Sequence, residues 1–412
     1  MSLENDRLIL RELAQRYAEI ASLPIHEEKR RLWRNLNMLK PERPMVTIDQ
    51  VCWNEMNIED KLTLKCEDGE CRGYEQMFRR ALYQWEYFPV DMVIEPFIRV
   101  PKAIHNSGFG MSVEEHTLAY YESNDVVSHR FGNQFQSMED VEKVKAPVVT
   151  HDPAETKRRM DTANWLFGDI VAPREEGYDP YLSVWDPIST WMGVENALYA
   201  MIDEPEMMHA LTARVAGGYM SMLDQMEEQG LLCHHQSLIH CTGAYTDELP
   251  APGFDPAKPR TKDIWMFGLA QMFSTVSPAT FDEYEIAYSM PIYERFGLVY
   301  YGCCDPLDGK MNEVRKIPHL RKISVSPWAN QEKMAREIGS DYVFSRKPNP
   351  SFIAMGSFDA DLIKRDLSDT VRLCKSSGCP VELIFKDIST VRSQPERLQK
   401  WAKIAMEVVN EQ

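Results

Sequence analysis

The chain has 412 residues, which is enough for one large barrel with additions or for two medium domains. Its 46 Lys and Arg against 63 Asp and Glu give a net charge of −17 without a concentrated basic stripe, so no nucleic-acid partner is expected. No apolar segment reaches the roughly 20 residues that span a bilayer, and the first residues lack a signal-peptide pattern. The nine cysteines show no framework spacing, so we expect a cytoplasmic protein with reduced thiols and no membrane partner.

The first part of the chain is predicted to be helical. Residues 4–39 carry helical periodicity, and Pro41 and Pro44 end this arm, which we define as residues 1–44. The elements expected next are a strand at 45–48, a helix at 74–87, a strand at 91–96, a hairpin-like insertion near 107–149, a helix at 158–167, a strand at 181–187 and a long helical region over about 194–230.

From residue 237 onward, strand-like and helical segments alternate regularly. The expected strands are 237–241, 264–267, 298–303, 322–326, 341–345 and 381–387, and the expected helices are 278–295, 331–338, 359–375 and 395–409. Repeated strand–helix units with polar, proline-marked loops indicate a parallel α/β fold. The number of units favours a (β/α)8 TIM barrel over residues 45–412, with an N-terminal helical extension and the inserted segment. No glycine-rich phosphate loop follows the first strand.

The run LVYYGCCDP at residues 298–306 is the most informative feature of the sequence. It places two adjacent thiols and the carboxylate of Asp305 at the end of an apolar, aromatic stretch that is typical of a buried strand. Thiols at the carboxyl end of a barrel strand can bind a soft metal or act as nucleophiles. The structural alternative is a pair of buried, inert cysteines, since free cysteine is among the most buried residue types.

Polar side chains follow most of the predicted strands, and in a barrel these would meet at one mouth. We expect Asp305, Lys347, Lys386 and Asp387 to be catalytic, and the expected substrate-binding residues are Glu95, Trp185, Asp186, Gln271, Tyr301, Ser326, Trp328 and Asn349. Each has a structural alternative. A carboxylate before proline can cap a turn, and Lys386 with Asp387 can form an ion pair. A purely structural role is a weaker explanation for all of these residues together than for any one of them, because structural residues need not gather at one end of the strands.

For a metal, the expected ligands are His240, Cys303 and Cys304, completed by a carboxylate or left with one open position. Catalytic zinc takes about three protein ligands from nitrogen and sulfur donors. Side chains alternate along a strand, so only one of two adjacent thiols faces inward unless the strand ends there. A zinc site and a metal-free site therefore both remain open.

Three stretches resemble the uroporphyrinogen decarboxylase-like superfamily. They are residues 195–206 (ENALYAMIDEPE), 276–284 (VSPATFDEY) and 301–305 (YGCCD). The last falls where related methyltransferases carry a His-x-Cys zinc motif, with Gly302 at the histidine position and Cys304 matching the cysteine. The end of the last strand has Lys386 and Asp387 where those methyltransferases have another cysteine. The resemblance implies a (β/α)8 barrel, often a homodimer, with its site at the strand carboxyl ends.

The superfamily contains two broad activities. Uroporphyrinogen decarboxylase is cofactor-free and uses an N-terminal arginine-rich loop, which the region around Arg16 does not show. The other branch transfers methyl groups from small methylated compounds, O-methyl aromatic compounds among them, to corrinoid proteins with the help of zinc. The sequence is more similar to this branch, which implies zinc, a corrinoid protein as partner and a role in anaerobic metabolism.

Two enzymatic hypotheses follow from these residues, besides a non-catalytic binding barrel, which the crowding of polar groups at strand ends disfavours. The first is a corrinoid-linked methyltransferase in which zinc or a positioned acid activates the methyl-bearing atom, and lysine or aspartate moves a proton. The alternative is a metal-free decarboxylase of a carboxylated small molecule, in which Lys347 and Lys386 hold carboxylates and Asp186 or Asp387 handles the proton.

Overall fold

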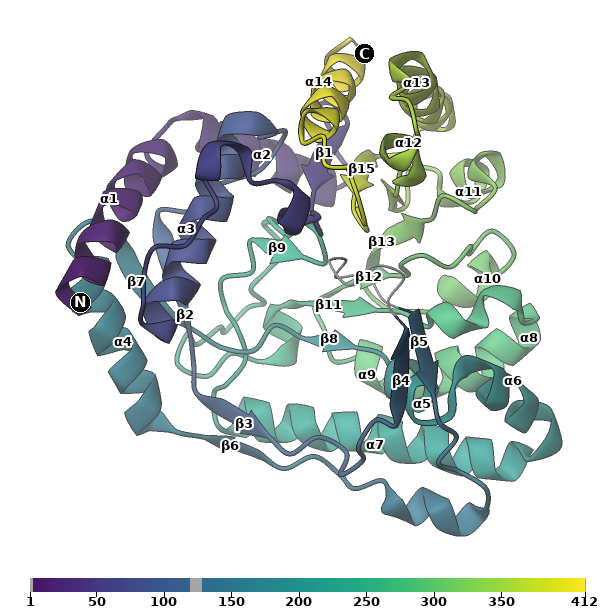
Figure 1. Ribbon diagram of the computed structural model, residues 1–412. Helices are drawn as coiled ribbons and strands as arrows, with labels where there is room; N and C mark the ends of the chain where they lie inside the picture. The colour runs from purple at the N-terminus through teal and green to yellow at the C-terminus, as the bar shows by residue number, and fades with distance from the viewer. Residues whose placement is uncertain (1–2, 119–127, 412) are drawn as a thin grey trace.

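The fold is built on a seven-stranded parallel sheet. The computed structural model describes residues 3–118 and 128–411 of the chain. In spatial order the strands are β1 (Met45–Ile48), β15 (Val381–Phe385), β14 (Val343–Arg346), β13 (Leu320–Val325), β12 (Leu298–Tyr301), β11 (Trp265–Gly268) and β8 (Tyr181–Leu182). All six neighbouring pairs run parallel. The strands curve around the centre of the molecule (Figure 1).

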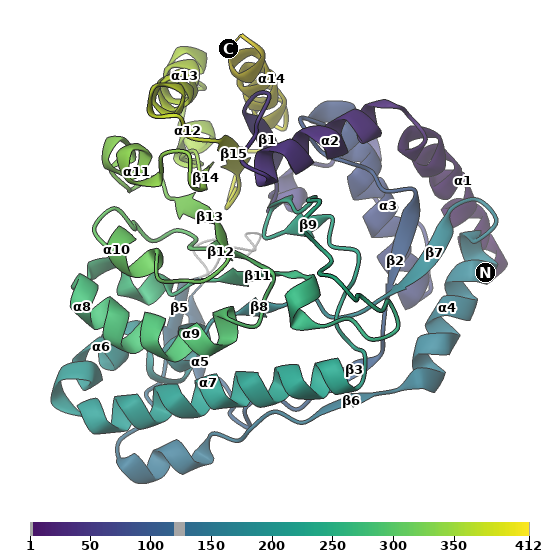
Figure 2. The same ribbon diagram turned by 180° about the vertical axis from the view of Figure 1, so that it is seen from behind.

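Helices surround the sheet, so most strand residues are buried on both faces (Figures 1 and 2). The α-helices are α1 (Leu3–Ala21), α2 (Ile25–Asn37), α3 (Gly69–Tyr87), α4 (Pro153–Phe167), α5 (Trp185–Met192), α6 (Val194–Asp203), α7 (Pro205–Glu228), α8 (Pro278–Phe281), α9 (Ala287–Tyr293), α10 (Met311–Val314), α11 (Gln331–Ile338), α12 (Ser351–Ala354), α13 (Ala360–Ser377) and α14 (Glu396–Asn410). Shorter turns are η1 (Trp53–Glu55), η2 (Ile58–Asp60), η3 (Met138–Lys143), η4 (Thr261–Asp263), η5 (Gln271–Thr275) and the π-turn η6 (Asp282–Ile286). No helix among the described residues has the length and apolar character needed to cross a bilayer.

Four smaller strand pairs lie outside the main sheet. They are β2 (Phe97–Pro101) parallel to β7 (Ala172–Glu176), and the antiparallel pairs β3 (Ile104–Asn106) with β6 (Val149–His151), β4 (Glu115–Leu118) with β5 (Ser128–Phe131), and β9 (Leu238–Ile239) with β10 (Thr242–Gly243). Two antiparallel pairs fall in or beside the segment predicted to be hairpin-like. The part of that prediction at 119–127 lies outside the described residues.

Local sequence fixes several helix ends. The side chains of Asp68, Ser277 and Asn330 each accept a hydrogen bond from a backbone N–H in the first turn of the helix that follows. At the other end, Gly378 adopts the left-handed conformation that closes α13. The predicted helix at 331–338 is confirmed at both ends because both of its end signals are local.

Three predicted strands are wrong in position or type. Residues 91–96 are irregular, and the strand begins only after Pro96, as β2. Residues 181–187 contain the two-residue strand β8, after which Trp185 begins helix α5, with Pro187 in its first turn. Residues 237–241 form half of the β9–β10 hairpin rather than a strand of the parallel sheet. The predicted N-terminal helix is also two helices, which Pro24 separates.

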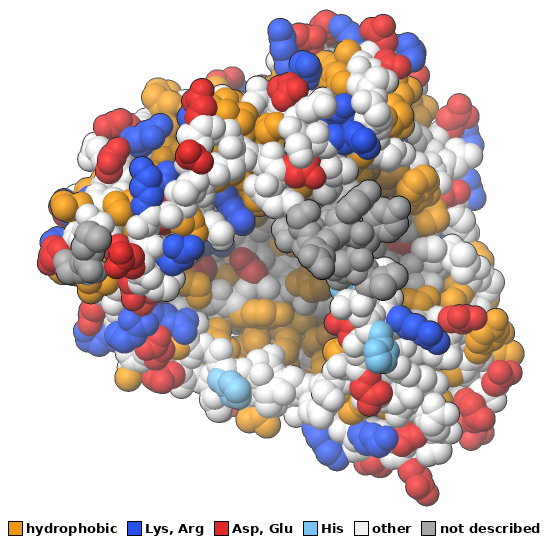
Figure 3. Space-filling view, in the orientation of Figure 1, with side chains coloured by type: hydrophobic (Ala, Val, Ile, Leu, Met, Phe, Trp, Pro, Cys, Tyr) orange, Lys and Arg blue, Asp and Glu red, His pale blue; other side chains and the backbone are white. Residues whose placement is uncertain are grey.

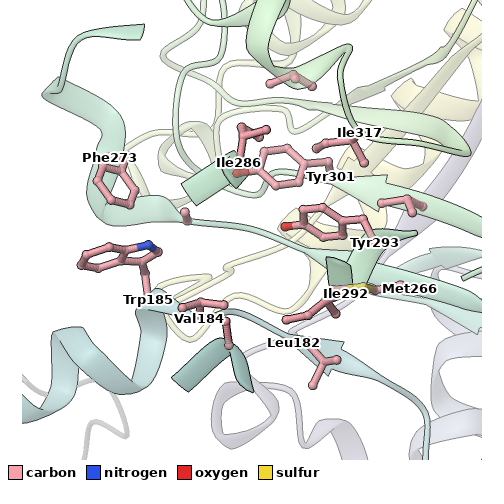
Figure 4. Close-up of a cluster of buried hydrophobic side chains, with 14 of the residues drawn as sticks. Leu182, Val184, Trp185, Met266, Phe273, Ile286, Ile292, Tyr293, Tyr301 and Ile317 are labelled. Atoms are coloured by element: carbon pink, nitrogen blue, oxygen red, sulfur yellow. The ribbon is translucent and has the colours of Figure 1, made fainter. Parts of the chain in front are cut away.

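The core on the outer side of β12 contains a buried carboxylic acid. Tyr293 and Tyr301 meet edge to face with ring centroids 5.9 Å apart (Figure 4), and both hydroxyls donate to Glu285 Oε1, at 2.8 and 3.2 Å. Ser289 donates to the other oxygen at 3.0 Å. Burial outweighs these hydrogen bonds and raises the pKa of Glu285 to about 7.

This shifted pKa predicts a pH-dependent stability that Glu285→Gln removes. An acid with its pKa raised on folding binds a proton more tightly in the native state, so stability falls as pH rises from the unfolded pKa through the folded one. We expect the advantage of the wild type over Glu285→Gln in free energy of unfolding to shrink by about 3 kcal/mol between about pH 5 and about pH 8. Denaturant unfolding measures it, with the exposed Glu283→Gln as control. A pH-independent difference would contradict the prediction.

Candidate functional site

The Cys303–Cys304 turn lies directly after β12, and the strand's alternation sorts its last two tyrosines. Tyr301 faces the outer core, whereas Tyr300 lies on the opposite side of the strand, against His240 and Phe267. Gly302 then turns the chain with a φ of 89°, and a Cβ at this position would lie 2.7 Å from Leu307 Cδ1. Only glycine fits both the conformation and the space.

Two hydrogen bonds hold the backbone of Cys303. Its N–H donates to Asp305 Oδ1 at 3.2 Å, and its carbonyl accepts from Ser324 Oγ at 2.5 Å. Asp305 is itself buried. The carboxylate therefore acts on the turn, where it fixes the direction of the cysteine side chain.

The Cys303 sulfur is the centre of a polar cluster at the carboxyl end of the sheet. Lys386 Nζ donates to Cys303 Sγ at 3.1 Å, and His240 Nε2 lies 3.4 Å from the same sulfur. Cys304 Sγ lies 3.6 Å from Cys303 Sγ and donates to Asp387 Oδ2 at 3.4 Å. Lys386 also pairs with Asp387 Oδ2 at 3.1 Å. We call these five residues, from three separate segments, the Cys303 cluster.

The surroundings favour a thiolate at Cys303. The hydrogen bond with Cys304 acts most strongly, and together with His240 and two lysine charges it outweighs burial, so the pKa of Cys303 is well below its ordinary value. The same hydrogen bond raises the pKa of Cys304, which burial and the charge on Cys303 raise further. The pair therefore carries one proton, which resides on Cys304 and can be donated to the Cys303 sulfur or to Asp387.

A second lysine reaches the cluster from β14. Lys347 is buried, and its Nζ donates to the Tyr300 hydroxyl and, at 3.4 Å, to the Ser345 carbonyl. Burial lowers the pKa of Lys347 to about 8, against the charge of Cys303, which raises it. Burial acts in the same direction on Lys386, but the charges of Cys303, Cys304 and Asp387 outweigh it, and the pKa of that lysine is raised. Of the two, Lys347 is the lysine able to exchange a proton near neutral pH.

The β9–β10 hairpin brings His240 to the sulfur. His240 and Cys241 form the two-residue turn, both with positive φ, of 35° and 69°. The His240 ring stacks on Phe267 with centroids 3.8 Å apart, and the ring of Tyr181 also stacks on Phe267. Burial lowers the pKa of His240, although the bond to Cys303 opposes it. A histidine in a strained turn, fixed by ring stacking, is oriented toward one partner.

Two residues near the cluster, Tyr300 and Asp49, were missed by the sequence-based prediction. Tyr300 was hidden in an apolar run, and its role follows only from its contact with Lys347. Asp49 follows β1 and is hydrogen-bonded to the Cys241 thiol, and burial raises the pKa of that thiol. Asp49 could have been suspected, since it ends a predicted strand as the other candidates do.

A buried ion pair lies in the interior beside this cluster. Lys322 and Glu382 are both 0 % exposed, and Lys322 Nζ donates to Glu382 Oε2 at 2.9 Å. Thr242 donates to the same oxygen at 2.6 Å, and Ser345 donates to the other. Both lysine and glutamate thus have their polar atoms satisfied within the protein.

The other predicted site residues are spread over several environments. Trp185 is buried in the core, where its ring meets Phe273 edge to face with centroids 4.8 Å apart (Figure 4). Asp186 accepts from the Tyr181 hydroxyl at 2.9 Å, and burial raises its pKa. Gln271 is exposed on η5. Asp186 is near the Cys303 cluster: the charge of Cys303 raises its pKa further, and the Tyr181 ring that it contacts lies 6.2 Å from that of His240.

Of the other predicted residues, Ser326 and Asn349 make contacts within their own turns, and Tyr301 lies in the core. Ser326 is buried and accepts from the backbone N–H of Trp328 at 3.3 Å, while the Trp328 side chain is 71 % exposed. Asn349 accepts from the backbone N–H of Ser351 at 3.0 Å, as in an Asx turn. Tyr301 donates to Glu285, as described above.

Glu95 belongs to a separate cavity. It bonds Arg30 at 3.1 Å and the Tyr245 hydroxyl at 2.5 Å and lines a cavity of about 530 Å³. Trp265, the first residue of β11, also lines that cavity, whereas Cys303 follows the carboxyl end of the neighbouring strand β12. Figure 3 shows the centre of one face of the molecule hollowed, with hydrophobic side chains on its floor.

The predicted zinc ligands lie at distances close to those of a zinc site, but a lysine is bonded to the sulfur that they share. The separations of 3.4 Å from His240 and 3.6 Å from Cys304 to the Cys303 sulfur are close to the edges of about 3.5–3.8 Å in a zinc tetrahedron. The Lys386 ammonium, however, bonds the same sulfur. Within residues 3–118 and 128–411, no three His, Cys, Asp or Glu side chains are arranged to hold a metal ion. As placed, the three donors do not fit zinc.

Comparison with known proteins adds little about function. No family model matches the sequence, and no curated protein matches it. Among solved structures, a methyltransferase from Methanosarcina mazei is similar, with a TM-score of 0.49 and 11% sequence identity, over 92% of this chain and 97% of that chain. At this degree of likeness, the neighbour's activity is no argument for the activity of this chain.

Proposed function

We propose that this chain is an enzyme that transfers a methyl group from a small methylated compound, and that the Cys303 thiolate is its reactive group. The observation that carries the proposal is the position of the Cys303 sulfur, 3.1 Å from Lys386 Nζ and 3.4 Å from His240 Nε2. An ammonium and an imidazole beside a sulfur favour the thiolate, which is the nucleophilic form. The resemblance to the uroporphyrinogen decarboxylase-like superfamily supports methyl transfer as the reaction.

The residues of the cluster suggest a division of labour. The thiolate attacks the methyl carbon, the carbon–oxygen bond breaks, and the leaving oxygen takes a proton from the Lys347 ammonium, which becomes neutral. A pKa of about 8 suits this exchange, because the proton is present below that pH and is not held too tightly to leave. The corrinoid of a partner protein would then accept the methyl group and free the thiolate.

Further parts of the proposal come from the resemblance. They are the corrinoid protein as partner, a homodimer, and a (β/α)8 barrel that includes the seven-stranded sheet. A zinc-dependent form of the reaction, as in related methyltransferases, is a separate proposal. In that form Lys386 would have to give up its hydrogen bond to Cys303 so that the sulfur could bind the metal. No step above depends on it.

The second candidate function, a metal-free decarboxylase, is favoured by the two lysines. Lys347 and Lys386 are each 2 % exposed, and both carry charges next to the same sulfur. A substrate carboxylate is a chemically suitable ligand for two converging ammonium groups. Asp186 or Asp387 would then handle the proton.

The deciding experiment supplies methyl donors and carboxylated compounds to the same preparation. With O-methylated aromatic compounds, we expect the tryptic peptide 296–310 to gain one methyl group at Cys303, and free cob(I)alamin to remove it with turnover. Carbon dioxide release from the matched carboxylates without any corrinoid would instead establish the decarboxylase. Metal content is measured in parallel. A content of about one zinc per chain that is lost in Cys303→Ser would mean that methyl transfer depends on zinc and that the metal-free reaction proposed here is wrong.

A further inference from the structure

The Cys303–Cys304 pair has a second chemical capacity, because its two sulfurs are adjacent and differ in protonation. The sulfurs lie 3.6 Å apart. Cys303 is buried and held by Lys386, whereas Cys304 is half-buried and faces the exposed carboxylate of Asp387. A thiolate with a thiol beside it is the arrangement that lets an oxidised sulfur be resolved to a disulfide.

We propose that Cys303 and Cys304 are a reversible oxidation site for peroxide, whose product is a disulfide between neighbouring residues. In the first step, the Cys303 thiolate attacks one peroxide oxygen, the O–O bond breaks, and sulfenic acid and hydroxide form. In the second step, Cys304 loses its proton and attacks the Cys303 sulfur, and the sulfenic oxygen leaves as water. Both sulfurs are oxidised by two electrons in total, and the peroxide is reduced.

Geometry makes the product easy to reduce. Consecutive Cα atoms are about 3.8 Å apart, which is shorter than the 4.4–6.8 Å of ordinary disulfides. The bond is therefore strained, and strained disulfides are the labile ones. The backbone cannot relax freely, because Ser324 and Asp305 hold both sides of Cys303. A dithiol is expected to restore the pair.

The surrounding charges are arranged to tolerate the loss of the thiolate. Once Cys303 is in a disulfide, Lys386 loses its anionic partner at 3.1 Å, but Asp387 already lies at 3.1 Å from the same ammonium. Asp387 in turn loses the Cys304 donor at 3.4 Å and keeps the lysine. Lys386 therefore keeps an anionic partner, and Lys347, whose pKa burial lowers to about 8, can release its proton when the charge of Cys303 is lost, so oxidation does not require unfolding.

The chain offers a matched control in Cys374 and Cys379. These two thiols are also hydrogen-bonded to each other, but Cys374 is fully buried and Cys379 donates to the Ala335 carbonyl at 3.2 Å. In the described part of the chain no lysine is hydrogen-bonded to either sulfur, and the cation that acts on Cys374 is the guanidinium of Arg346. We expect this pair to stay reduced under conditions that oxidise the Cys303–Cys304 pair.

The experiment treats the folded full-length protein with a small molar excess of hydrogen peroxide, blocks free thiols, and measures peptide 296–310 by mass spectrometry. We expect that peptide to lose two hydrogen atoms and to regain them with dithiothreitol, while the Cys374 and Cys379 peptides are alkylated in full. In Cys304→Ser, dimedone should trap sulfenic acid at Cys303. Two alkylated thiols in peptide 296–310, or sulfinic acid at Cys303 without a disulfide, would overturn the proposal.

The readout is a mass and does not depend on turnover. Disulfide formation in a protein without methyl transfer activity would support this inference and refute the proposed function. Methyl transfer activity without disulfide formation would support the proposed function and refute this inference. If both hold, oxidation removes the nucleophile, and we expect methyl transfer to fall at least about tenfold and to recover with dithiothreitol.

Discussion

Cys303→Ser is expected to lower methyl transfer by about 10³-fold or more while the protein stays folded. The neighbours that favour the thiolate are Lys386 at 3.1 Å and His240 at 3.4 Å, and neither can make a serine hydroxyl ionise near neutral pH. The substitution replaces sulfur by oxygen at one atom, so packing around the turn changes little. Initial rates with saturating donor measure the effect, and the rate of alkylation by iodoacetamide provides a readout that needs no substrate.

Cys304→Ser is the matched control for this prediction. Its hydroxyl can still donate to the Cys303 sulfur or to Asp387, as the Cys304 thiol does, so we expect less than about a tenfold change in rate. If Cys303→Ser retains the wild-type rate, or if Cys304→Ser is the inactive variant, the nucleophile is not Cys303. A merely structural effect would instead lower stability in both variants without a selective loss of alkylation.

Lys322→Met is expected to lower the free energy of unfolding by about 3–5 kcal/mol. The substitution leaves the Glu382 carboxylate, which is 0 % exposed, without its cation at 2.9 Å. Thr242 and Ser345 still donate to it, but two hydroxyl groups do not offset a buried charge. Urea unfolding followed by tryptophan fluorescence measures the change, because Trp33 and Trp265 lie over Lys322.

The double variant Lys322→Met with Glu382→Leu tests the cause. Removing both charges leaves no uncompensated ion, so we expect most of the lost stability to return. Lys316→Met breaks an exposed ion pair with Asp282 and should change stability little. A double variant as unstable as Lys322→Met would mean that packing, and not the buried charge, is responsible.

Much of the sheet was predictable from the sequence. Strands β11, β12, β13, β14 and β15 fall within or beside predicted segments because each is a short apolar run bounded by polar or proline-containing loops. Fully buried parallel strands have that pattern regardless of what packs on them. The ends of α11 were equally predictable, since Asn330 and Gly339 act within one turn.

Long-range contacts decided the elements that were predicted wrongly. Trp185 reads as a strand residue in the run YLSVWDP, yet it begins α5 and fills the core against Phe273. Leu238 and Ile239 read as a sheet strand, yet they pair with Thr242 and Gly243 in a hairpin. Short apolar runs fit several structures, and only their neighbours in space select one.

The sequence by itself determined that two thiols follow a buried strand, and that Lys347 and Lys386 follow two others, because the order of residues and the alternation of side chains along a strand are local properties. Only the tertiary structure decided that these residues share one sulfur, because Cys303, His240 and Lys386 come from segments far apart in the chain. The tertiary structure also decided that Tyr300 accepts a hydrogen bond from Lys347 and that Tyr301 donates one to Glu285. Register and packing set these contacts, and neither is encoded in any short stretch of sequence.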